Sequence, residues 1–327
     1  MAKITVVAPA NTMCNLDVSM IDFGIDNLSR LGHTVTIHEE CFLNKNNISG
    51  TIEQRVSSIN RAITDKSTDI IMVVFGGYNC NDLIDYIDFS SLYQKNKLLI
   101  GYSDTTVLLN AYYAATGGVS LHGPGFGSFC DPGLAIETIN GFTDALTLGE
   151  KEKKLIQPER TASDLWFLKK GFGPREWKPH PKWKSLNKGE AIGVLIGGNI
   201  ESFLNLVGTK YCPDFNEKIF LIESSFNTNP NQFRMWLSHL KACGIFEKIS
   251  GLLVGNFTNC SAENINQELL SDLISEFVPE KIPTLINFSS SHADPILAVP
   301  IGGLIHMKLT DDRSEVYMSA PSIRQSN

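Results

Sequence analysis

The sequence predicts an α/β fold in which helices cover both faces of a parallel sheet. Apolar segments such as KITVVAPA and DIIMVVF read as strands buried on both faces, and they alternate with segments of helical spacing. The 327 residues, 43% hydrophobic and 19% charged, are typical of a globular protein with about two domains. Together these observations predict repeated strand–helix–strand units.

The N-terminal half supplies these elements in regular order. Its predicted strands are KITVVAPA, TVTIHE, DIIMVVF, KLLIGY and GVSLHGP. Its predicted helices carry Val18, Ile21, Ile25 and Leu28 on one face, or run from Ile52 to Ile63 and from about Asp104 to Ala115. Sites in such sheets lie beyond the carboxyl ends of the strands, so we expect functional residues there.

The chain is predicted to divide into an N-terminal domain (1–146), a connection (147–189) and a smaller C-terminal domain (190–327). The connection is charged, contains prolines and holds three of the four Trp residues, as in a long functional loop. The C-terminal part resumes with AIGVLIGGN, KIFLIES and ISGLLVGNF, helical patterns around 203–206, 233–240 and 265–277, and short β segments near 284–288, 298–301, 305–309 and 315–318. It is predicted to be mixed α/β.

Composition excludes several classes of partner. The net charge of −7 disfavours nucleic acid and anionic membranes, although Lys169 to Lys188 form a local basic stretch. The N-terminal apolar segment breaks at Pro9, too early for a signal peptide or a membrane span, which predicts a cytoplasmic protein. Seven cysteines without a C-x-x-C pair, and no H-x-x-x-H spacing, predict neither disulfides nor a metal site. We expect no cofactor, since G-x-G-x-x-G and G-K-[ST] are both missing.

The segment KLLIGYSDTT offers a candidate nucleophile. A predicted buried strand leads through Ser103 straight into a helix, and such a turn lifts the hydroxyl clear of the sheet beside unpaired backbone N–H groups. The alternative is that Ser103 only caps the helix, and the G-x-S-x-G form is missing because position 105 is Thr. Upstream, Gly76 and Gly77 end another strand, where their N–H groups can face an oxyanion or form an ordinary turn.

A serine nucleophile needs a base, and the base needs an acid to orient it. Glu223 stands where the strand KIFLIE ends, and His292 lies in a Ser-rich loop before another short strand. Either residue alone would more commonly be a surface or structural residue. With Ser103 they form an ordered set of Ser, Glu and His, each at a strand-to-loop transition.

Seven motifs then resemble the LD-carboxypeptidase family of serine peptidases, and within it the microcin C self-immunity branch. They are GGYN (76–79), GYSDTT (101–106), HGP (122–124), GGN (197–199), LIES (221–224), GIFEKISGLLVG (244–255) and the spacing from His292 to PIG. The resemblance implies a Rossmann-like N-terminal domain, with the active site in the cleft between the two domains. It also implies a homodimer.

Carried over by motif, the resemblance makes Ser103 the nucleophile, His292 the general base and Glu223 its orienting carboxylate. The backbone N–H groups of Gly77 and Asp104 would form the oxyanion hole. Gly76 and Asn199 would contact the substrate, a small molecule or short peptide.

Departures from the family pattern bear on the substrate. Phe75 and Asn79 flank the GGY motif where wall-recycling members carry Arg and Gly, which resembles the immunity branch. Against that branch, GNF (255–257) replaces its GKH pattern, and Ala293-Asp294 replaces Thr-His. The sequence therefore predicts cleavage of a peptidyl- or aminoacyl-nucleotide. The alternatives are a murein tetrapeptide carboxypeptidase and a non-catalytic small-molecule binding protein.

The aromatic connection is the predicted site of base recognition. One of Trp166, Trp177 and Trp183 could stack on a purine while a nearby Lys or Arg meets a phosphate, or all three could simply hold the loop to its domain. Trp177 is our preferred candidate because Arg175 and Lys178 flank it, and Trp166 is the second.

Overall fold

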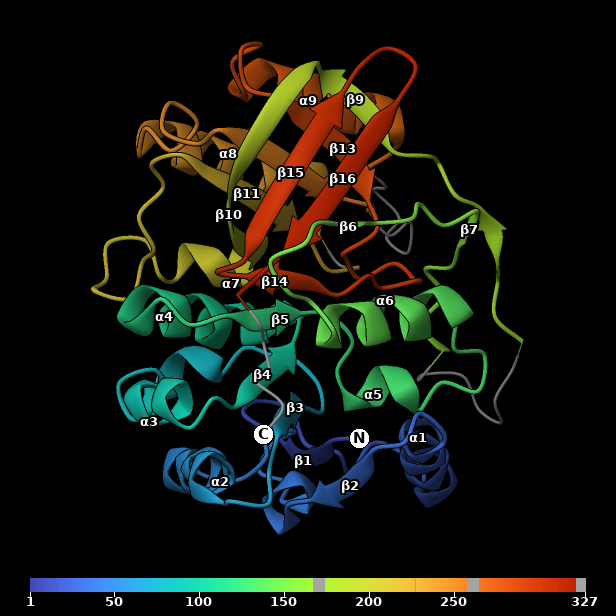
Figure 1. Ribbon diagram of the computed structural model, residues 1–327, viewed down its shortest axis with the longest axis vertical. Coiled ribbons are helices and arrows are strands. Elements are labelled where there is room, and N and C mark those ends of the chain that lie inside the picture. Colours follow the sequence, from blue (N-terminus) through green and yellow to red (C-terminus); the bar gives the residue numbers. More distant parts are fainter. Residues whose placement is uncertain (167–173, 227, 258–264, 322–327) are drawn as a thin grey trace.

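Two large β-sheets stacked end to end form most of the protein, and a third sheet has two short strands (Figure 1). The computed structural model describes residues 1–166, 174–226, 228–257 and 265–321. The first large sheet takes its strands from the N-terminal half of the chain except for one near residue 300, most of the second comes from the C-terminal half, and one hydrophobic core includes residues of both. The predicted α/β class is confirmed. The division at residues 146 and 189 stays a prediction.

The first sheet has the strand order β14-β5-β4-β3-β1-β2, and its strands are parallel except for β14. The strands are β1 (Lys3–Val7), β2 (Thr34–Ile37), β3 (Ile70–Val73), β4 (Leu98–Gly101), β5 (Ser120–His122) and β14 (Val299–Ile301). Every residue of β3 and β4 is buried, which explains their continuous apolar sequence.

Helices cover both faces of this sheet, as Figure 1 shows. One face carries α2 (Ile52–Thr64), α3 (Phe89–Gln94) and α4 (Thr106–Thr116), and the other carries α1 (Val18–Arg30), α5 (Phe126–Phe129) and α6 (Ile136–Leu146). Helix α2 starts where the sequence dictates, because Thr51 and Gln54 form a reciprocal capping box.

The second sheet is mixed, with the order β6-β16-β15-β10-β11-β12-β13-β9. Its central strands, β10 (Gly189–Asn199), β11 (Lys218–Glu223), β12 (Gly251–Gly255) and β13 (Thr284–Phe288), are parallel. The strands β15 (Leu304–Leu309) and β16 (Ser314–Ser319) add to it antiparallel. Helices α7 (Ile200–Leu204), α8 (Pro230–Ala242) and α9 (Gln267–Phe277) complete this half.

The connection contains more regular structure than its composition suggests. Its described part forms β6 (Lys153–Lys154), β7 (Arg160–Thr161), β8 (Lys178–Pro179) and β9 (Lys184–Asn187). Strands β6 and β9 are the two edge strands of the second sheet and pair with β16 and β13. These segments lack the alternation of apolar and polar residues that predicts a strand. They form strands because they pair with an existing edge of the second sheet, and their composition does not encode that pairing.

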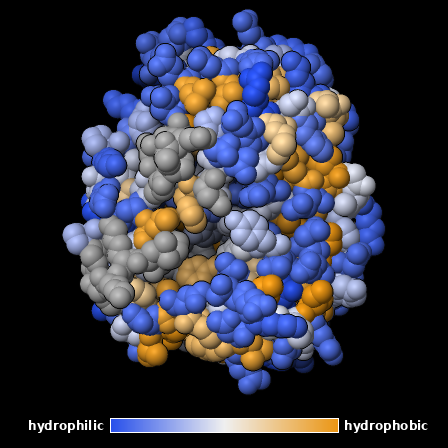
Figure 2. Space-filling model, turned by 180° about the vertical axis from the view of Figure 1, so that it is seen from behind, coloured by the Kyte–Doolittle hydropathy of each residue, from blue (hydrophilic) through white to orange (hydrophobic). Residues whose placement is uncertain are grey.

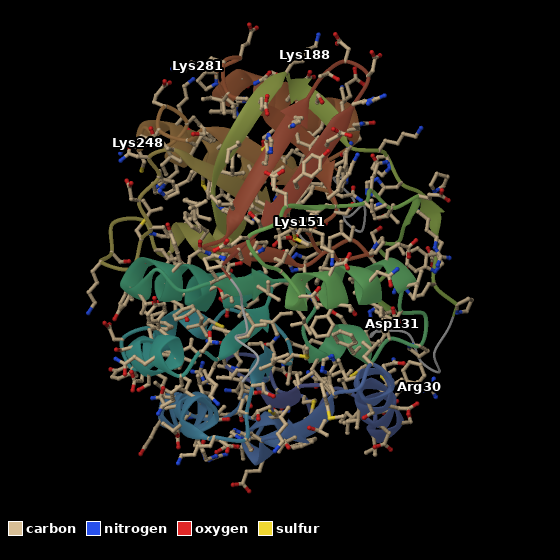
Figure 3. The ribbon with its side chains drawn as sticks, in the orientation of Figure 1. Arg30, Asp131, Lys151, Lys188, Lys248 and Lys281 are labelled. Atoms are coloured by element: carbon tan, nitrogen blue, oxygen red, sulfur yellow. The ribbon has the colours of Figure 1, made fainter. Side chains whose placement is uncertain are left out.

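The face shown in Figure 2 is largely hydrophilic and is hollowed near its middle. Two described residues of the predicted basic stretch point in different directions: Arg175 turns inward onto carboxylates, while Lys188 points outward at the far end of the second sheet and pairs with Asp311 (Figure 3). No helix in the described ranges is long and apolar enough to cross a membrane.

Candidate active site

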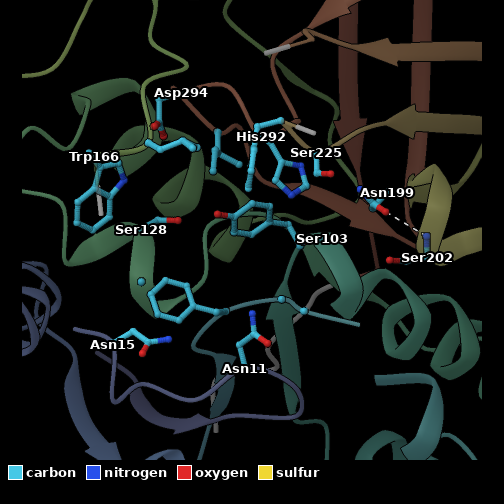
Figure 4. A pocket seen from close by; sticks show the side chains of 18 of the residues that line it. Asn11, Asn15, Ser103, Ser128, Trp166, Asn199, Ser202, Ser225, His292 and Asp294 are labelled. Carbon is cyan, nitrogen blue, oxygen red and sulfur yellow. Dashed lines mark hydrogen bonds between the residues drawn. The ribbon is translucent and has the colours of Figure 1, made fainter. Parts of the chain in front are cut away.

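A cavity of about 370 Å³ lies where the carboxyl ends of strands from both sheets meet (Figure 4). Its lining includes Ser103 after β4, Gly76 and Gly77 after β3, and His292 after β13. The size suits a small-molecule substrate. Residues of the first sheet, the second sheet and the connection therefore share one pocket.

Ser103 lies in a sharp turn between β4 and α4. Its φ of +61° falls in the left-handed region, which is rare for a residue with a side chain and is characteristic of strained functional turns. A short 3₁₀ turn, Ser103–Thr105, leads into α4. Asn110 of that helix bonds both backbone groups of Gly197 at 2.8 Å, which fastens α4 to β10. The turn is thus held from both sheets.

The carboxylate of Asp104 ties this turn to the loop after β3. Its Oδ2 accepts hydrogen bonds from the backbone N–H groups of Asn79 at 2.7 Å and Cys80 at 2.9 Å. Burial raises the pKa of Asp104 in spite of these bonds. The side chain of Asp104 thus holds the loop after β3 against this turn. Its backbone N–H directly follows Ser103.

Gly76 and Gly77 bring the neighbouring backbone against the serine. A Cβ at Gly76 would lie 2.6 Å from Ser103 Cβ and 3.0 Å from the backbone nitrogen of Asp104, so only glycine fits. Gly77 has a φ of +156°, and a Cβ there would meet Asn11. The two predicted oxyanion donors therefore belong to adjacent backbone segments beside Ser103.

Glu223 and His292 form a short, buried pair. Nδ1 of His292 donates to Oε2 of Glu223 at 2.6 Å, and the Glu223 side chain is fully buried at the end of β11. Burial alone would raise the pKa of Glu223, but the charge and hydrogen bond of His292, with smaller effects of His122 and Asn199, hold it below its usual value. An ionised carboxylate thus fixes Nδ1 as the protonated nitrogen and leaves Nε2 to act as a base.

The imidazole of His292 packs against Tyr102, with ring centroids 5.2 Å apart. Both residues line the cavity with Ser103 (Figure 4). Among the described residues, no hydrogen bond joins Ser103 to His292. The structure thus brings the predicted nucleophile, base and acid into one site; their catalytic roles stay a prediction.

The predicted substrate-binding residues fall into two groups. Asn199 and Trp166 line the cavity, and Oδ1 of Asn199 accepts from the backbone N–H of Ser202 at 3.1 Å, capping α7 (Figure 4). Trp177, our preferred candidate, does not line it. Its ring lies between Arg160 and Arg175, with their guanidinium carbons 4.3 and 5.3 Å from the ring centroid.

The described lining thus includes Trp166 but not the preferred Trp177, whose two basic neighbours make cation–π contacts with its ring. Trp183 is buried, and its Nε1–H donates to Ser289 at 3.0 Å, so it holds the connection to the loop after β13. Lys169 and Lys170, at the start of the predicted basic stretch, lie outside the described residues.

Arg175 organises a cluster that sequence reasoning missed. Its guanidinium bonds Asp131, Asp164 (3.0 Å) and Asp294 (2.7 Å), which come from three separate parts of the chain. Asp164 and Asp294 also line the cavity. Burial raises the pKa of Asp294 to about 6, against the opposing effect of Arg175. No local sequence signal relates these residues, but Asp294 lies two positions after His292.

The acidic residues lining the described part of the cavity are Asp164, Glu201 and Asp294, and this lining contains no Lys or Arg. Asn11, Thr12 and Asn15 also line it and were not predicted, although they follow β1 and the rule of strand carboxyl ends applies to them. Within the described ranges, no group of three or more His, Cys, Asp or Glu residues could hold a metal ion.

Comparison with known proteins identifies the family. The profile of the LD-carboxypeptidase N-terminal domain matches residues 4–123, and that of the C-terminal domain matches residues 192–307. A putative carboxypeptidase of Treponema pallidum is 31% identical over 94% of this chain and 90% of its own length. The microcin C7 self-immunity protein MccF of Escherichia coli is 29% identical, over 78% and 75%. A probable murein peptide carboxypeptidase of Bacillus subtilis is 26% identical, over 94% and 89%.

Solved structures share the fold over nearly the whole chain. An MccF-like protein from Bacillus anthracis superimposes with a TM-score of 0.91 at 27% identity, covering 98% of this chain and 97% of that one. MccF in complex with aspartyl sulfamoyl adenosine gives a TM-score of 0.88 at 25% identity, covering 99% and 97%. On both family profiles and these relatives, the chain belongs to the LD-carboxypeptidase family and is a serine peptidase.

Proposed function

We propose that the protein is a serine carboxypeptidase-type hydrolase in which Ser103 is the nucleophile, His292 the general base and Glu223 its orienting carboxylate. The 2.6 Å contact between His292 and the buried Glu223, in the same cavity as the strained Ser103, carries this proposal. Such a set needs no cofactor.

In the proposed reaction, Nε2 of His292 takes the proton of Ser103 as Oγ attacks the substrate carbonyl. The backbone N–H groups of Gly77 and Asp104 stabilise the oxyanion, in a cavity that limits access of water. His292 then protonates the leaving group and an acyl-serine remains. Water, deprotonated by His292, releases the acid and restores Ser103. The hydrogen bond between Ser103 and His292 would tighten as substrate binds.

We propose a peptidyl- or aminoacyl-nucleotide as the substrate, cleaved at its amide or acyl-phosphoramidate bond. Two observations support this class: Trp166 offers an aromatic face inside the cavity, and the fold is shared with MccF bound to aspartyl sulfamoyl adenosine. The second candidate is murein tetrapeptide hydrolysis, favoured by relatives named for that activity. The lack of Lys and Arg in the described lining does not distinguish the two candidates, because both substrates are anionic.

Two measurements test the proposal. A fluorophosphonate probe should label Ser103, identified by peptide mass spectrometry, and labelling should vanish in Ser103→Ala but persist in Ser128→Ala, which removes another serine of the cavity. No labelling of folded protein would favour a non-catalytic binding protein. Hydrolysis of an aminoacyl-adenylate analogue should then exceed hydrolysis of an L,D-linked tetrapeptide; the reverse order would select the murein activity.

On family resemblance, we also propose that the enzyme works in the cytoplasm as a homodimer. Light scattering coupled to size-exclusion chromatography measures the oligomeric state directly. A mass near 36.1 kDa, that of one chain, would contradict the dimer.

A further inference from the structure

The two carboxylate oxygens of Glu223 have different surroundings. Oε2 accepts the hydrogen bond of His292, whereas Oε1 is buried and has no hydrogen-bond partner within the described structure. The imidazole of His122 lies on that side, with its Nε2 3.9 Å from Oε1. Nε2 of His122 is likewise buried and without a partner among the described residues, and both side chains are fully buried. Two unpaired polar atoms therefore face each other.

Glu223 belongs to the second sheet, whereas His122 belongs to the first. His122 is the last residue of β5 and pairs with Gly101 of β4, which lies two residues before Ser103. Its Nδ1 lies 3.0 Å from Oγ of Ser290, two residues before His292. One ring therefore contacts the strand beside the nucleophile, the loop that carries the base, and the carboxylate that orients the base.

Electrostatics decide which ring nitrogen carries the proton. Burial lowers the pKa of His122 to about 4, so the ring is neutral at physiological pH. With the proton on Nδ1, the lone pair of Nε2 would face an ionised carboxylate and repel it. With the proton on Nε2, the hydroxyl of Ser290 donates to Nδ1, and the N–H dipole points toward Oε1. The second arrangement satisfies both buried groups.

We propose that His122 is a positioning residue: its neutral ring directs Nε2–H toward Oε1 of Glu223 and so keeps Oε2 on His292. The proposal rests on the triad roles assigned above. Without this N–H, Oε1 would be buried with no donor facing it, and rotation of the carboxylate away from His292 would become more favourable.

Four side chains face the carboxylate of Glu223 from separate elements. They are His292 from the loop after β13, His122 from β5, Asn199 from the end of β10 and Tyr102 from the turn after β4. His122 is the one whose ring nitrogen lies nearest to the unpaired Oε1, at 3.9 Å.

The test compares His122→Gln, which can place an N–H near the position of Nε2, with His122→Leu, which cannot. The measured quantity is the rate constant for fluorophosphonate labelling of Ser103 from pH 5 to 9, so no natural substrate is needed. We expect His122→Leu to react about tenfold more slowly. His122→Gln should recover most of this loss.

Because His122 is buried, Ser290→Ala gives a second route if the Leu variant does not fold. It removes only the hydroxyl that fixes the tautomer, and it should slow the labelling of Ser103 by a smaller factor than His122→Leu. Unchanged rate constants in the folded variants, or equal losses in Gln and Leu, would overturn the role of His122 and leave the triad intact. Failure to label Ser103 in the unmodified protein would overturn both proposals.

Discussion

Ser103 and His292 handle one proton between them, so their substitutions should not be additive. We expect Ser103→Ala and His292→Ala each to remove nearly all hydrolysis, on the order of 10⁶-fold, and the double variant to be little slower than either. Glu223→Gln should cost less, because a poorly oriented imidazole is still a base. Values of kcat for the three single variants and the double variant test this. Substantial turnover by Ser103→Ala would contradict the assignment.

Gly76 allows a second test at single-residue scale. A Cβ there would lie 2.6 Å from Ser103 Cβ, so Gly76→Ala must displace either the serine or the loop that faces it. A displacement of about 1 Å at a reacting group can cost ~10²-fold in rate. We expect fluorophosphonate labelling to slow by at least that factor. Gly149→Ala is the matched control, since a Cβ at Gly149 has no neighbour within 4 Å, and its labelling rate should not change.

Single site residues could be predicted from the sequence where the neighbouring residues show that a strand ends. Ser103, Glu223 and His292 each follow a strong apolar segment, so the ends of strands located them. The contacts of Trp177, Arg175 and His122 depend on residues distant in the sequence, and no spacing rule relates such positions. That is why the sequence could not show that Trp166, and not Trp177, lies in the described cavity lining, and why the acidic cluster was missed.

At the scale of elements, the connection (147–189) contributes both to the wall of the cavity and to contacts outside it. Its first described part places Trp166 in the cavity wall, and its second part holds Trp177 between two arginines. Its composition indicated an irregular, functional segment. The pairing of β6 and β9 with the second sheet could not be predicted, because an edge strand draws its hydrogen bonds from a partner far away in sequence.

Trp166→Ala and Trp177→Ala should therefore differ in kind. We expect Trp166→Ala to weaken binding of an aminoacyl-adenylate analogue by ~10- to 100-fold, the cost of one lost base stack, with little change in Tm. Trp177→Ala should instead lower Tm by a few degrees and leave binding nearly unchanged. Calorimetric titration and thermal melts of both variants in the Ser103→Ala background measure this. Equal effects on binding would argue against purine recognition by Trp166.

At the scale of the molecule, two buried histidines make stability depend on pH. Burial lowers the pKa of both His122 and His180 to about 4, from 6.5 when exposed. Between these pH values the unfolded chain binds more protons, so each histidine makes the free energy of unfolding fall by about 1.4 kcal/mol per pH unit as the pH drops. Asp294, with a pKa raised to about 6, acts in the opposite sense between pH 3.8 and 6.

Comparing His180→Gln with the unmodified protein isolates one of these contributions. The effect of Asp294 cancels in the difference, and the slope against pH should decrease by about 1.4 kcal/mol per pH unit between pH 6 and 5. Urea unfolding at several pH values supplies the slopes. Parallel curves for the two proteins would show that His180 is not held neutral by the fold.

The α/β class and the order of elements could be predicted because hydrophobic periodicity is a local property. The assembly of the sheets could not. β14, from the predicted C-terminal part, forms the edge of the first sheet beside β5. Nothing in its three residues indicates which strand it pairs with.

That edge strand bears on how the protein is made. While a ribosome is still synthesising the chain, the sheet that holds Ser103 lacks its last strand until residues 299–301 have emerged. Until then β5, with His122 at its end, is an unpaired edge strand. We therefore expect activity to appear only after nearly the whole chain has been synthesised. A fragment comprising residues 1–190 should remain unreactive toward fluorophosphonate and become labelled only when a fragment comprising residues 191–327 is supplied.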